Sequence, residues 1–295
     1  MVRGANRASH GKSAVNLTAH LRLIIEHMDI VTQKGQPSSI LGLAGNQSME
    51  ISCVRAAFEA GVNYFFFYNL SFNNLLDGLK PLLSARREEL VVATGSENRD
   101  RRGLSQYLDE VRRHLNIDVV DVFFAEYISP TDDLGQVKSV LEELHIWKEK
   151  GLIRYVGATV HNRPLALELI EAGACDVLMH RYNMAHRGAE EKVLPAARQA
   201  GIPVIAFTCT RWGSLLSARP DWQGKVPRAA DCYRYALRHP AVRLALTAPQ
   251  TRTQLESNLR VLQAPRLTHH EVVLWQEYGT LVYGSGQDAF ETEWL

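Results

Sequence analysis

From Ser38 onward, short apolar segments alternate with longer amphipathic segments, and this alternation repeats eight times. The apolar segments are typical of buried strands, and the amphipathic segments place their apolar residues at helical spacing. The predicted strands are residues 38–43, 62–68, 89–93, 119–125, 153–158, 175–180, 203–208 and 242–247. The predicted helices are residues 48–60, 73–84, 103–115, 135–150, 163–172, 188–200, 228–238 and 251–262.

Eight strand–helix units of about 25–30 residues predict parallel strands joined by crossover helices. Gly61, Gly151, Gly173 and Gly201 follow predicted helices, where a left-handed cap turns the chain toward the next strand. Closing the strands into a ring gives a (β/α)₈ TIM barrel at its usual size of about 250 residues. A doubly wound open sheet is the alternative. It is disfavoured because GLAGNQ at 42–47 lacks the G-x-G-x-x-G pattern.

Two segments flank the barrel units. Residues 1–37 are predicted to be an N-terminal extension to a barrel domain at 38–295, and Leu17–Val31 within it has helical apolar spacing. We expect this N-terminal helix to pack on the outside of the domain. After the eighth unit, the segment 268–283 predicts a terminal helix that covers one end of the barrel.

Composition narrows the class of partner. The chain has 295 residues, and its 33 Lys and Arg against 32 Asp and Glu leave no cationic field for nucleic acid. It lacks both an apolar run of about 20 residues for a membrane span and the apolar core of a signal peptide in its first 16 residues. Four separated cysteines show no metal-ligand spacing. We therefore expect a cytoplasmic protein with a small-molecule substrate and no metal; nothing in the sequence specifies an oligomer.

In this fold the active site lies at the carboxyl ends of the strands. Glu126 closes the apolar segment VVDVFF, and partial desolvation there would raise its pKa into a useful acid/base range. A structural salt bridge to Arg181 or Arg211 is the alternative. His161, just after the fifth strand, could share the site with Glu126 or make a purely structural hydrogen bond.

Other residues at strand ends suit a substrate pocket. The aromatic run 65–68 should send alternate rings into the barrel, so that Phe66 and Tyr68 could line a pocket for an apolar or planar substrate. Tyr68 is also a candidate catalytic residue. The guanidinium groups of Arg181 and Arg211 could bind a carboxylate or phosphate of the substrate; the alternative is that they only anchor loops. The predicted substrate pocket comprises Phe66, Asn69, Tyr127, Arg181 and Trp212.

Several segments resemble the aldo-keto reductase superfamily, in the family's order and spacing. They include AAFEAGVNYFF (56–66), HLNIDVVDVFF (114–124), LEELHIWKEKGLIRYVGAT (141–159), GIPVIAF (201–207) and QTRTQLESNL (250–259). The segments TVHNRP (159–164) and RYNMAHRGAE (181–190) are similar to a divergent branch of that family. The resemblance implies carbonyl reduction by NADPH with a tetrad of Asp, Tyr, Lys and His.

All four tetrad positions differ here. The family's Asp position holds Phe66, the Tyr position falls at Ser71 and Phe72, the Lys position holds Gly95, and the His position holds Glu126. We therefore expect no ordinary aldehyde reduction, because the general acid and the ammonium that would lower its pKa are missing.

The positions that hold the cofactor in the family are altered in part. Thr159 is the only hydrogen-bonding residue at the carboxamide positions, and Phe207 keeps the aromatic character of the ring under nicotinamide. Gln254 and Asn258 match the family's adenine-binding end. NADP is therefore a candidate cofactor whose binding the replacements put in question. The implied cofactor residues are Thr159, Phe207, Thr210, Arg211, Gln250, Arg252, Gln254 and Asn258.

Three hypotheses for function follow. The first is a barrel enzyme that acts on a small metabolite with Glu126, and His161 in a supporting role, as acid/base groups. The second is an NADPH-dependent oxidoreductase with an altered proton path. The third is a catalytically silent barrel that binds a ligand or a protein.

Overall fold

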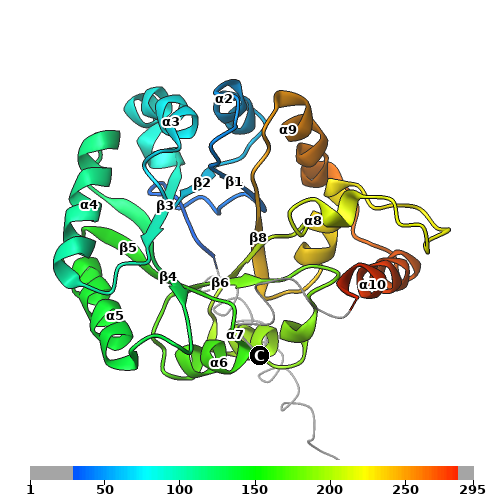
Figure 1. Cartoon of the computed structure of the whole chain (residues 1–295). Coiled ribbons are helices and arrows are strands. Elements are labelled where there is room, and N and C mark those ends of the chain that lie inside the picture. Colours follow the sequence, from blue (N-terminus) through cyan, green and yellow to red (C-terminus); the bar gives the residue numbers. More distant parts are fainter. Residues whose placement is uncertain (1–28, 285–295) are drawn as a thin grey trace, which may run out of the picture.

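The computed structural model describes residues 29–284, which form a closed barrel of eight parallel strands in sequence order (Figure 1). Each strand overlaps a predicted one, and β8 pairs with β1 to close the ring. The predicted (β/α)₈ barrel is confirmed, and the open sheet is excluded. The strands are β1 (Leu41–Ala44), β2 (Tyr64–Phe67), β3 (Val91–Ser96), β4 (Val120–Ile128), β5 (Ile153–Val160), β6 (Val177–Arg181), β7 (Val204–Phe207) and β8 (Val242–Thr247).

Helices surround the barrel (Figure 1). Gly61, Gly151, Gly173 and Gly201 all have φ between 58° and 95°, as the predicted left-handed turns after helices require. The α-helices are α2 (Ser52–Glu59), α3 (Asn73–Arg86), α4 (Arg101–Leu115), α5 (Leu134–Glu149), α6 (Arg163–Glu171), α7 (Val193–Ala200), α8 (Ala229–Leu237), α9 (Arg252–Leu259) and α10 (His269–Tyr283). The 3₁₀ turns are η1 (Arg87–Glu89), η2 (Gly188–Glu190), η3 (Ser214–Leu216) and η4 (Arg260–Gln263).

Strand alternation divides the core into two parts. Along β2, Phe65 and Phe67 pack outward in the apolar layer shared with the helices, whereas Tyr64 and Phe66 belong to the cluster inside the barrel. This is the alternation predicted for the aromatic run, and it follows from the period of two along a strand.

The amino end of the barrel is held by a buried carboxylate on β4. Asp121 is fully buried, accepts a hydrogen bond from Val92 N at 2.8 Å, and forms ion pairs at 2.8 Å with Arg87 and Arg154. Arg154 also donates to the carbonyl of Val31. The network therefore joins three neighbouring strands to the segment that precedes β1.

The segment that precedes β1 differs from the predicted helix in the residues that the structure describes, from Asp29 onward. Most of the predicted helix over Leu17–Val31 lies outside the described residues, and its last three residues are not helical. Val31 instead forms an antiparallel bridge with Pro37, and Ile30 is buried in the cluster inside the barrel. The turn between Val31 and Pro37 is closed by a hydrogen bond of 2.8 Å from Thr32 N to the Gln36 carbonyl.

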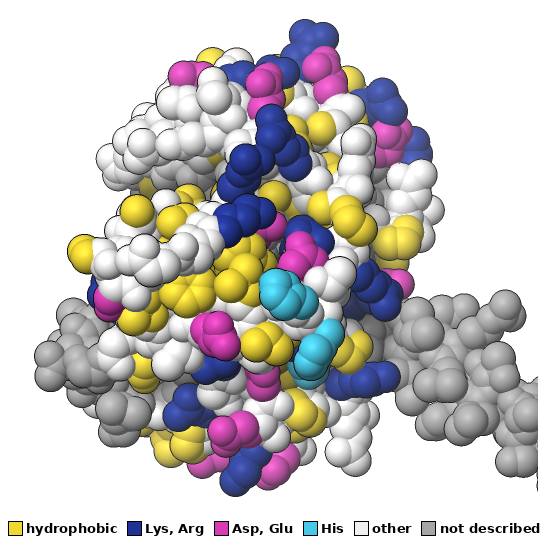
Figure 2. Space-filling view, turned by 90° about the vertical axis from the view of Figure 1, so that its right-hand side faces the viewer, with side chains coloured by type: hydrophobic (Ala, Val, Ile, Leu, Met, Phe, Trp, Pro, Cys, Tyr) yellow, Lys and Arg dark blue, Asp and Glu magenta, His cyan; other side chains and the backbone are white. Residues whose placement is uncertain are grey.

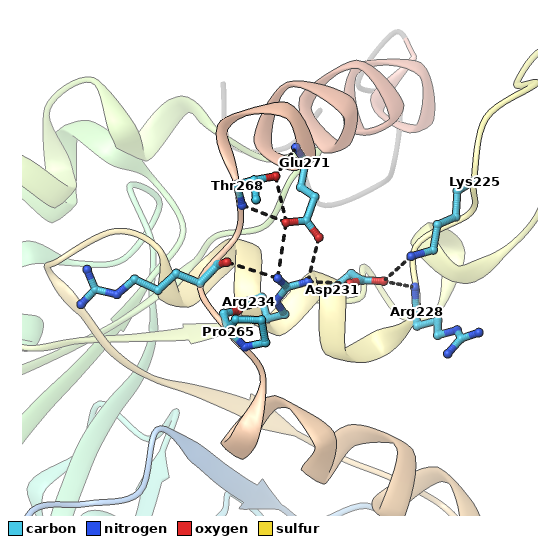
Figure 3. Close-up of polar contacts among 8 residues, drawn as sticks. Lys225, Arg228, Asp231, Arg234, Pro265, Thr268 and Glu271 are labelled. Atoms are coloured by element: carbon cyan, nitrogen blue, oxygen red, sulfur yellow. Dashed lines mark hydrogen bonds and ion pairs between the residues drawn. The ribbon is translucent and has the colours of Figure 1, made fainter.

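Helix α10 lies beside α8 on the flank of the barrel, so the prediction that it covers one end is wrong (Figure 1). Arg234 of α8 links Asp231 on its own helix, at 3.1 Å, to Glu271 at the start of α10, at 3.2 Å (Figure 3). Thr268 and Glu271 form a capping box at the same place. This network fixes the start of α10, and Gly279 brings its second half against the backbone at Met184.

The surface shows no field of one sign on the face seen in Figure 2, where basic and acidic side chains are intermingled. This agrees with the formal net charge of +1. No helix within residues 29–284 has the length and apolar character that crossing a membrane requires.

Replacing Gly279 by alanine tests the close packing of α10. A Cβ there would lie 2.0 Å from the Met184 carbonyl oxygen and 2.4 Å from its carbon, which belong to the backbone and cannot rotate away. We expect Gly279→Ala to lower the melting temperature by about 3–10 °C, although alanine usually stabilises a helix relative to glycine. Thermal unfolding followed by circular dichroism measures this change. Val273→Ala, at an exposed position of the same helix, is the control and should change little; a rise for Gly279→Ala would contradict the packing.

Candidate active site

A cavity of about 640 Å³ opens at the carboxyl ends of the strands, which is within the usual size range of small-molecule sites. The strand ends and the loops after β1, β7 and β8 form its wall. Twelve of the residues predicted for the site line it: Phe66, Tyr68, Glu126, Tyr127, Thr159, His161, Phe207, Thr210, Trp212, Gln250, Gln254 and Asn258.

Four predicted residues do not line this cavity. Asn69 is exposed and accepts a hydrogen bond from Ser71 N. Arg211 donates to the carbonyl of Val282 and to His186, and Arg252 pairs with Glu256 along its own helix. Arg181 lines a neighbouring pocket. Long side chains leave a fixed Cα in several directions, which explains why strand position alone misplaced three arginines relative to the cavity.

Glu126 presents a buried carboxyl group in the cavity wall. The residue is only 2% exposed, and its Oε1 has no hydrogen-bond partner within residues 29–284. It forms no ion pair within the described part of the chain, so the predicted salt bridge to Arg181 or Arg211 is not seen. Arg99, the nearest favourable charge, is engaged by Asp132 at 2.8 Å and donates to the backbone carbonyl of Glu126.

The pKa of Glu126 rises to about 8, above its ordinary value near 4.5. Burial is the largest cause, the charge of Glu97 adds to it, and Arg99 opposes it. The carboxyl group is therefore mostly protonated at neutral pH. A protonated acid in a cavity wall can give a proton to a substrate oxygen, and its carboxylate can later take one back.

Gly95 makes the room that Glu126 occupies. A Cβ at position 95 would lie 2.4 Å from Glu126 Oε1 and 2.7 Å from the backbone oxygen of Phe124. Any longer side chain at the end of β3 would therefore collide with the glutamate. Residues 95 and 126 are therefore coupled through the packing of neighbouring strands.

His161 stands between two aromatic rings. It stacks on Tyr127 with ring centroids 5.5 Å apart, and meets Phe207 edge-on at 4.9 Å. Its pKa falls to about 3, chiefly because of burial and also because Arg181 lies near. The ring is neutral at physiological pH and a weak base, so it suits hydrogen bonding and shaping of the wall better than proton transfer.

Aromatic side chains give the cavity its apolar surface. Tyr68 packs edge-on against Phe72 at 4.9 Å and is 48% exposed, while Phe66 meets Phe124 edge-on at 5.9 Å. Burial raises the pKa of the Tyr127 hydroxyl to about 12, and the neighbouring Glu126 charge adds to this rise. Tyr127 is therefore a neutral hydrogen-bonding group at neutral pH.

The rim of the cavity is built on strained backbone. Tyr127, Thr208, Arg211 and Trp212 are non-glycine residues with φ between 49° and 53°, in the left-handed region. Such conformations cost about 1–3 kcal/mol each and cluster at functional sites. Three of these four residues line the cavity. Their strain indicates that the loop after β7 and the end of β4 are shaped for a task other than stability.

The nicotinamide end of the implied cofactor has a receptive surface. Thr159 is 1% exposed and lines the cavity, and its Oγ1 has no hydrogen-bond partner. Burying a hydroxyl without a partner costs free energy, which a ligand amide could recover. Phe207 supplies an aromatic face in the same wall, although His161 already covers one side of that ring.

The adenine end is largely satisfied by the protein itself. The Gln254 amide oxygen accepts from Gln250 N at 2.7 Å, and Asn258 donates to Thr247 Oγ1 at 2.8 Å. A carboxylate oxygen of Glu50 accepts from Arg252 N at 2.9 Å, at the start of α9. A phosphate would compete with that carboxylate for the same end of the helix dipole. The residues present therefore fit the nicotinamide end of a dinucleotide better than its adenosine end.

Some lining residues are not among the predicted catalytic, cofactor or substrate residues. Thr208 and Cys209 follow β7, and Asn46, Gln47 and Ser48 follow β1. Their position directly after a strand was the signal that could have identified them, because the fold brings all such positions to one end. Thr208 Oγ1 is also buried without a hydrogen-bond partner. No group of three or more His, Cys, Asp or Glu within residues 29–284 could hold a metal ion.

Comparisons with known proteins agree with this architecture. An uncharacterized oxidoreductase of Bacillus subtilis, YqkF, is 22% identical over 291 residues, covering 84% of this chain and 92% of the relative. An Escherichia coli NADH-specific methylglyoxal reductase is 25% identical over 103 residues, but only 35% of this chain and 32% of that protein are covered.

Solved structures show the same fold at low identity. Aldo-keto reductase AKR11C1 from Bacillus halodurans, in its holo form, has a TM-score of 0.68 at 20% identity and covers 83% of this chain and 93% of its own. An aldo/keto reductase from Klebsiella pneumoniae, in complex with NADP and acetate, has a TM-score of 0.69 at 14% identity and covers 86% and 95%.

A family model settles the classification. The model of the aldo/keto reductase family matches residues 41–228, from the first strand of the barrel to the start of α8. That match includes β1 to β7 and the positions of Glu126, Thr159, His161 and Phe207. The chain belongs to the aldo/keto reductase family.

Proposed function

We propose that the protein is an oxidoreductase that acts on a small metabolite and uses Glu126 as its principal acid/base group. The observation that carries the proposal is the carboxyl group of Glu126, buried in the cavity wall with one oxygen unpaired among the described residues and with its pKa raised by burial. A buried acid with a pKa near the working pH is what proton transfer to a substrate oxygen requires. Family membership supports oxidoreduction as the reaction class.

The proton path differs from the one implied by the family resemblance. A phenol activated by lysine is replaced by a carboxylic acid, whose proton is held by burial and by the charge of Glu97. Glu126 lies on a strand rather than on a loop, so its position is fixed by the sheet. His161 and Tyr127 would orient the substrate oxygen by hydrogen bonds.

A nicotinamide dinucleotide, when bound, would supply the hydride that this reaction needs. Thr159 would hold its carboxamide, and Phe207 would pack against its ring. NADP is one candidate, and the structural relative that binds NADP supports it. The aromatic side chains of Phe66 and Tyr68 would exclude water from the substrate side.

The first prediction tests Glu126 through activity. Glu126→Gln should lower kcat/KM by about 10²–10⁴-fold, because it removes the transferable proton and keeps the shape. Wild-type kcat/KM should fall as pH rises through about 8, where the acid form is lost. Aldehydes and ketones screened with NADH and NADPH provide the assay. Glu142→Gln, on the outer surface of α5, is the matched control; equal activity of Glu126→Gln and wild type would remove Glu126 from the mechanism.

The second prediction tests the same proton through stability. Unfolded glutamate has a pKa of about 4.3, so between that pH and about 8 the folded state binds more protons than the unfolded state. The contribution of Glu126 to the free energy of unfolding therefore falls as pH rises through this window. Relative to wild type, Glu126→Gln should gain stability between pH 5 and pH 9, by up to about 4 kcal/mol. Urea unfolding at several pH values measures the difference. If the free energies of unfolding of the two proteins change with pH in parallel, the raised pKa is contradicted.

The third prediction concerns the cofactor. Thr159→Val removes a buried hydroxyl that has no partner, so it should leave thermal stability unchanged or slightly raised. If that hydroxyl holds the carboxamide, the same variant should weaken dinucleotide binding by about 2–10-fold. Titration of nucleotide fluorescence measures affinity without turnover, and Thr159→Ser should restore it. Absence of binding of both NADH and NADPH to the wild type would instead favour a silent binding barrel.

A further inference from the structure

A second pocket of about 390 Å³ adjoins the cavity. It lies between the loops that follow β5 and β6, the start of α6 and the end of α10. His161 lines both the cavity and this pocket, so the two meet at its ring. Three arginines and two further histidines also line the pocket: Arg163, Arg181, Arg187, His180 and His186.

Two of the guanidinium groups, those of Arg163 and Arg187, have no acidic partner among residues 29–284. Arg163 lies against the backbone at Gly188, where a Cβ would be 1.8 Å from its Nη1, and it forms no ion pair with residues 29–284. Arg187 donates to Thr280 Oγ1 at 2.8 Å and likewise meets no carboxylate in that range. Arginine presents several donors in a fixed plane, which suits the paired oxygens of a carboxylate or phosphate.

The acidic residues around the pocket do not cancel this charge. Glu190 already accepts hydrogen bonds from Tyr182 and Tyr235 and pairs with Arg238 at 2.5 Å. Glu191 is exposed at the rim. Among residues 29–284, no carboxylate therefore offsets the charges of Arg163 and Arg187 at the pocket wall, and these charges favour an anion.

His180 adds a hydrogen-bond acceptor to these donors. The residue is 2% exposed, and its Nδ1 lies 2.6 Å from the Val160 carbonyl, which fixes the proton on that nitrogen. Burial lowers its pKa to about 4, so the ring is neutral at pH 7. Nε2 is then the ring nitrogen that can accept a hydrogen bond, and because His180 lines the pocket, a ligand hydroxyl could donate to it.

We propose that this pocket binds a small oxyanion that also carries an O–H donor. Arg163 and Arg187 would bind the anionic oxygens, and His180 would accept the hydroxyl. A 2-hydroxycarboxylate and a phosphate monoester both have this chemistry. Provided that the proposed function holds, His161 joins this pocket to the cavity that contains Glu126, so the substrate is an anionic metabolite with its charged end here.

Calorimetric titration of the full chain at constant ionic strength tests the proposal. The probes are inorganic phosphate, lactate and acetate, which has no hydroxyl. We expect phosphate or lactate to bind about 2–10-fold more tightly than acetate, through the hydrogen bond to His180. Tighter binding of lactate would indicate a 2-hydroxycarboxylate as the ligand class, and tighter binding of phosphate would indicate a phosphate monoester. Arg163→Met and Arg187→Met should each weaken binding by about tenfold or more.

Arg101→Met is the control, because Arg101 lies on α4 away from the pocket and pairs with Glu142 and Glu143. It should bind the probes as wild type does, and circular dichroism checks that each variant folds. Unchanged affinity in both pocket variants, or no saturable binding of any probe, would overturn the proposal. Glu126→Gln should leave probe binding unchanged while lowering activity, so failure of the anion site and failure of the proposed function give different results.

Discussion

Strand β4 carries a buried carboxyl group near each end, and the two groups differ in whether a positive charge compensates them. Asp121 at the amino end has two arginines and a backbone N–H as partners, and it ties three strands to the preceding segment. Glu126 at the carboxyl end has no ion pair among the described residues. A buried charge is tolerable only when it is paired, so the first group stabilises the fold and the second is kept protonated. This matches the general division of the barrel into a stability end and a reactive end.

The space beside Glu126 links two neighbouring strands at the carboxyl end of the barrel. Gly95, the residue before the last of β3, has no side chain, and the carboxyl group of Glu126 fills the volume beside it. A lysine at position 95 would collide with the side chain of Glu126 in its present position. The proposed acid therefore depends on a glycine in the neighbouring strand as much as on its own side chain.

The sequence was informative where burial decides the structure. Continuous apolar runs identified all eight strands because both faces of each strand are covered, and glycines identified the helix ends where φ must be positive. The end of β4 was placed too early, at residue 125, because a charged residue interrupts the apolar run even though Glu126 and Tyr127 continue the strand to Ile128. The helix expected to begin at residue 188 begins at Val193, after the 3₁₀ turn η2.

Side-chain direction was the part of the site that the sequence could not specify. Position along a strand fixes a Cα, and short side chains such as that of Thr159 were therefore placed in the cavity wall. Arg211 and Arg252 have long, flexible side chains, and each turns to a partner that is distant in the chain or lies on the outer helix surface. The pairing of Gly95 with Glu126 was also hidden, because it depends on contact between two strands rather than on spacing within one.

The proton on Glu126 has a thermodynamic consequence for any molecule that enters the cavity. A ligand that places positive charge beside the carboxyl group favours release of this proton to solvent, whereas a ligand that accepts a hydrogen bond from it favours retention. Binding and protonation are then linked, so the apparent affinity changes with pH and the measured heat of binding includes the ionisation heat of the buffer. The fraction of protein that has ligand bound therefore depends on pH as well as on the ligand concentration.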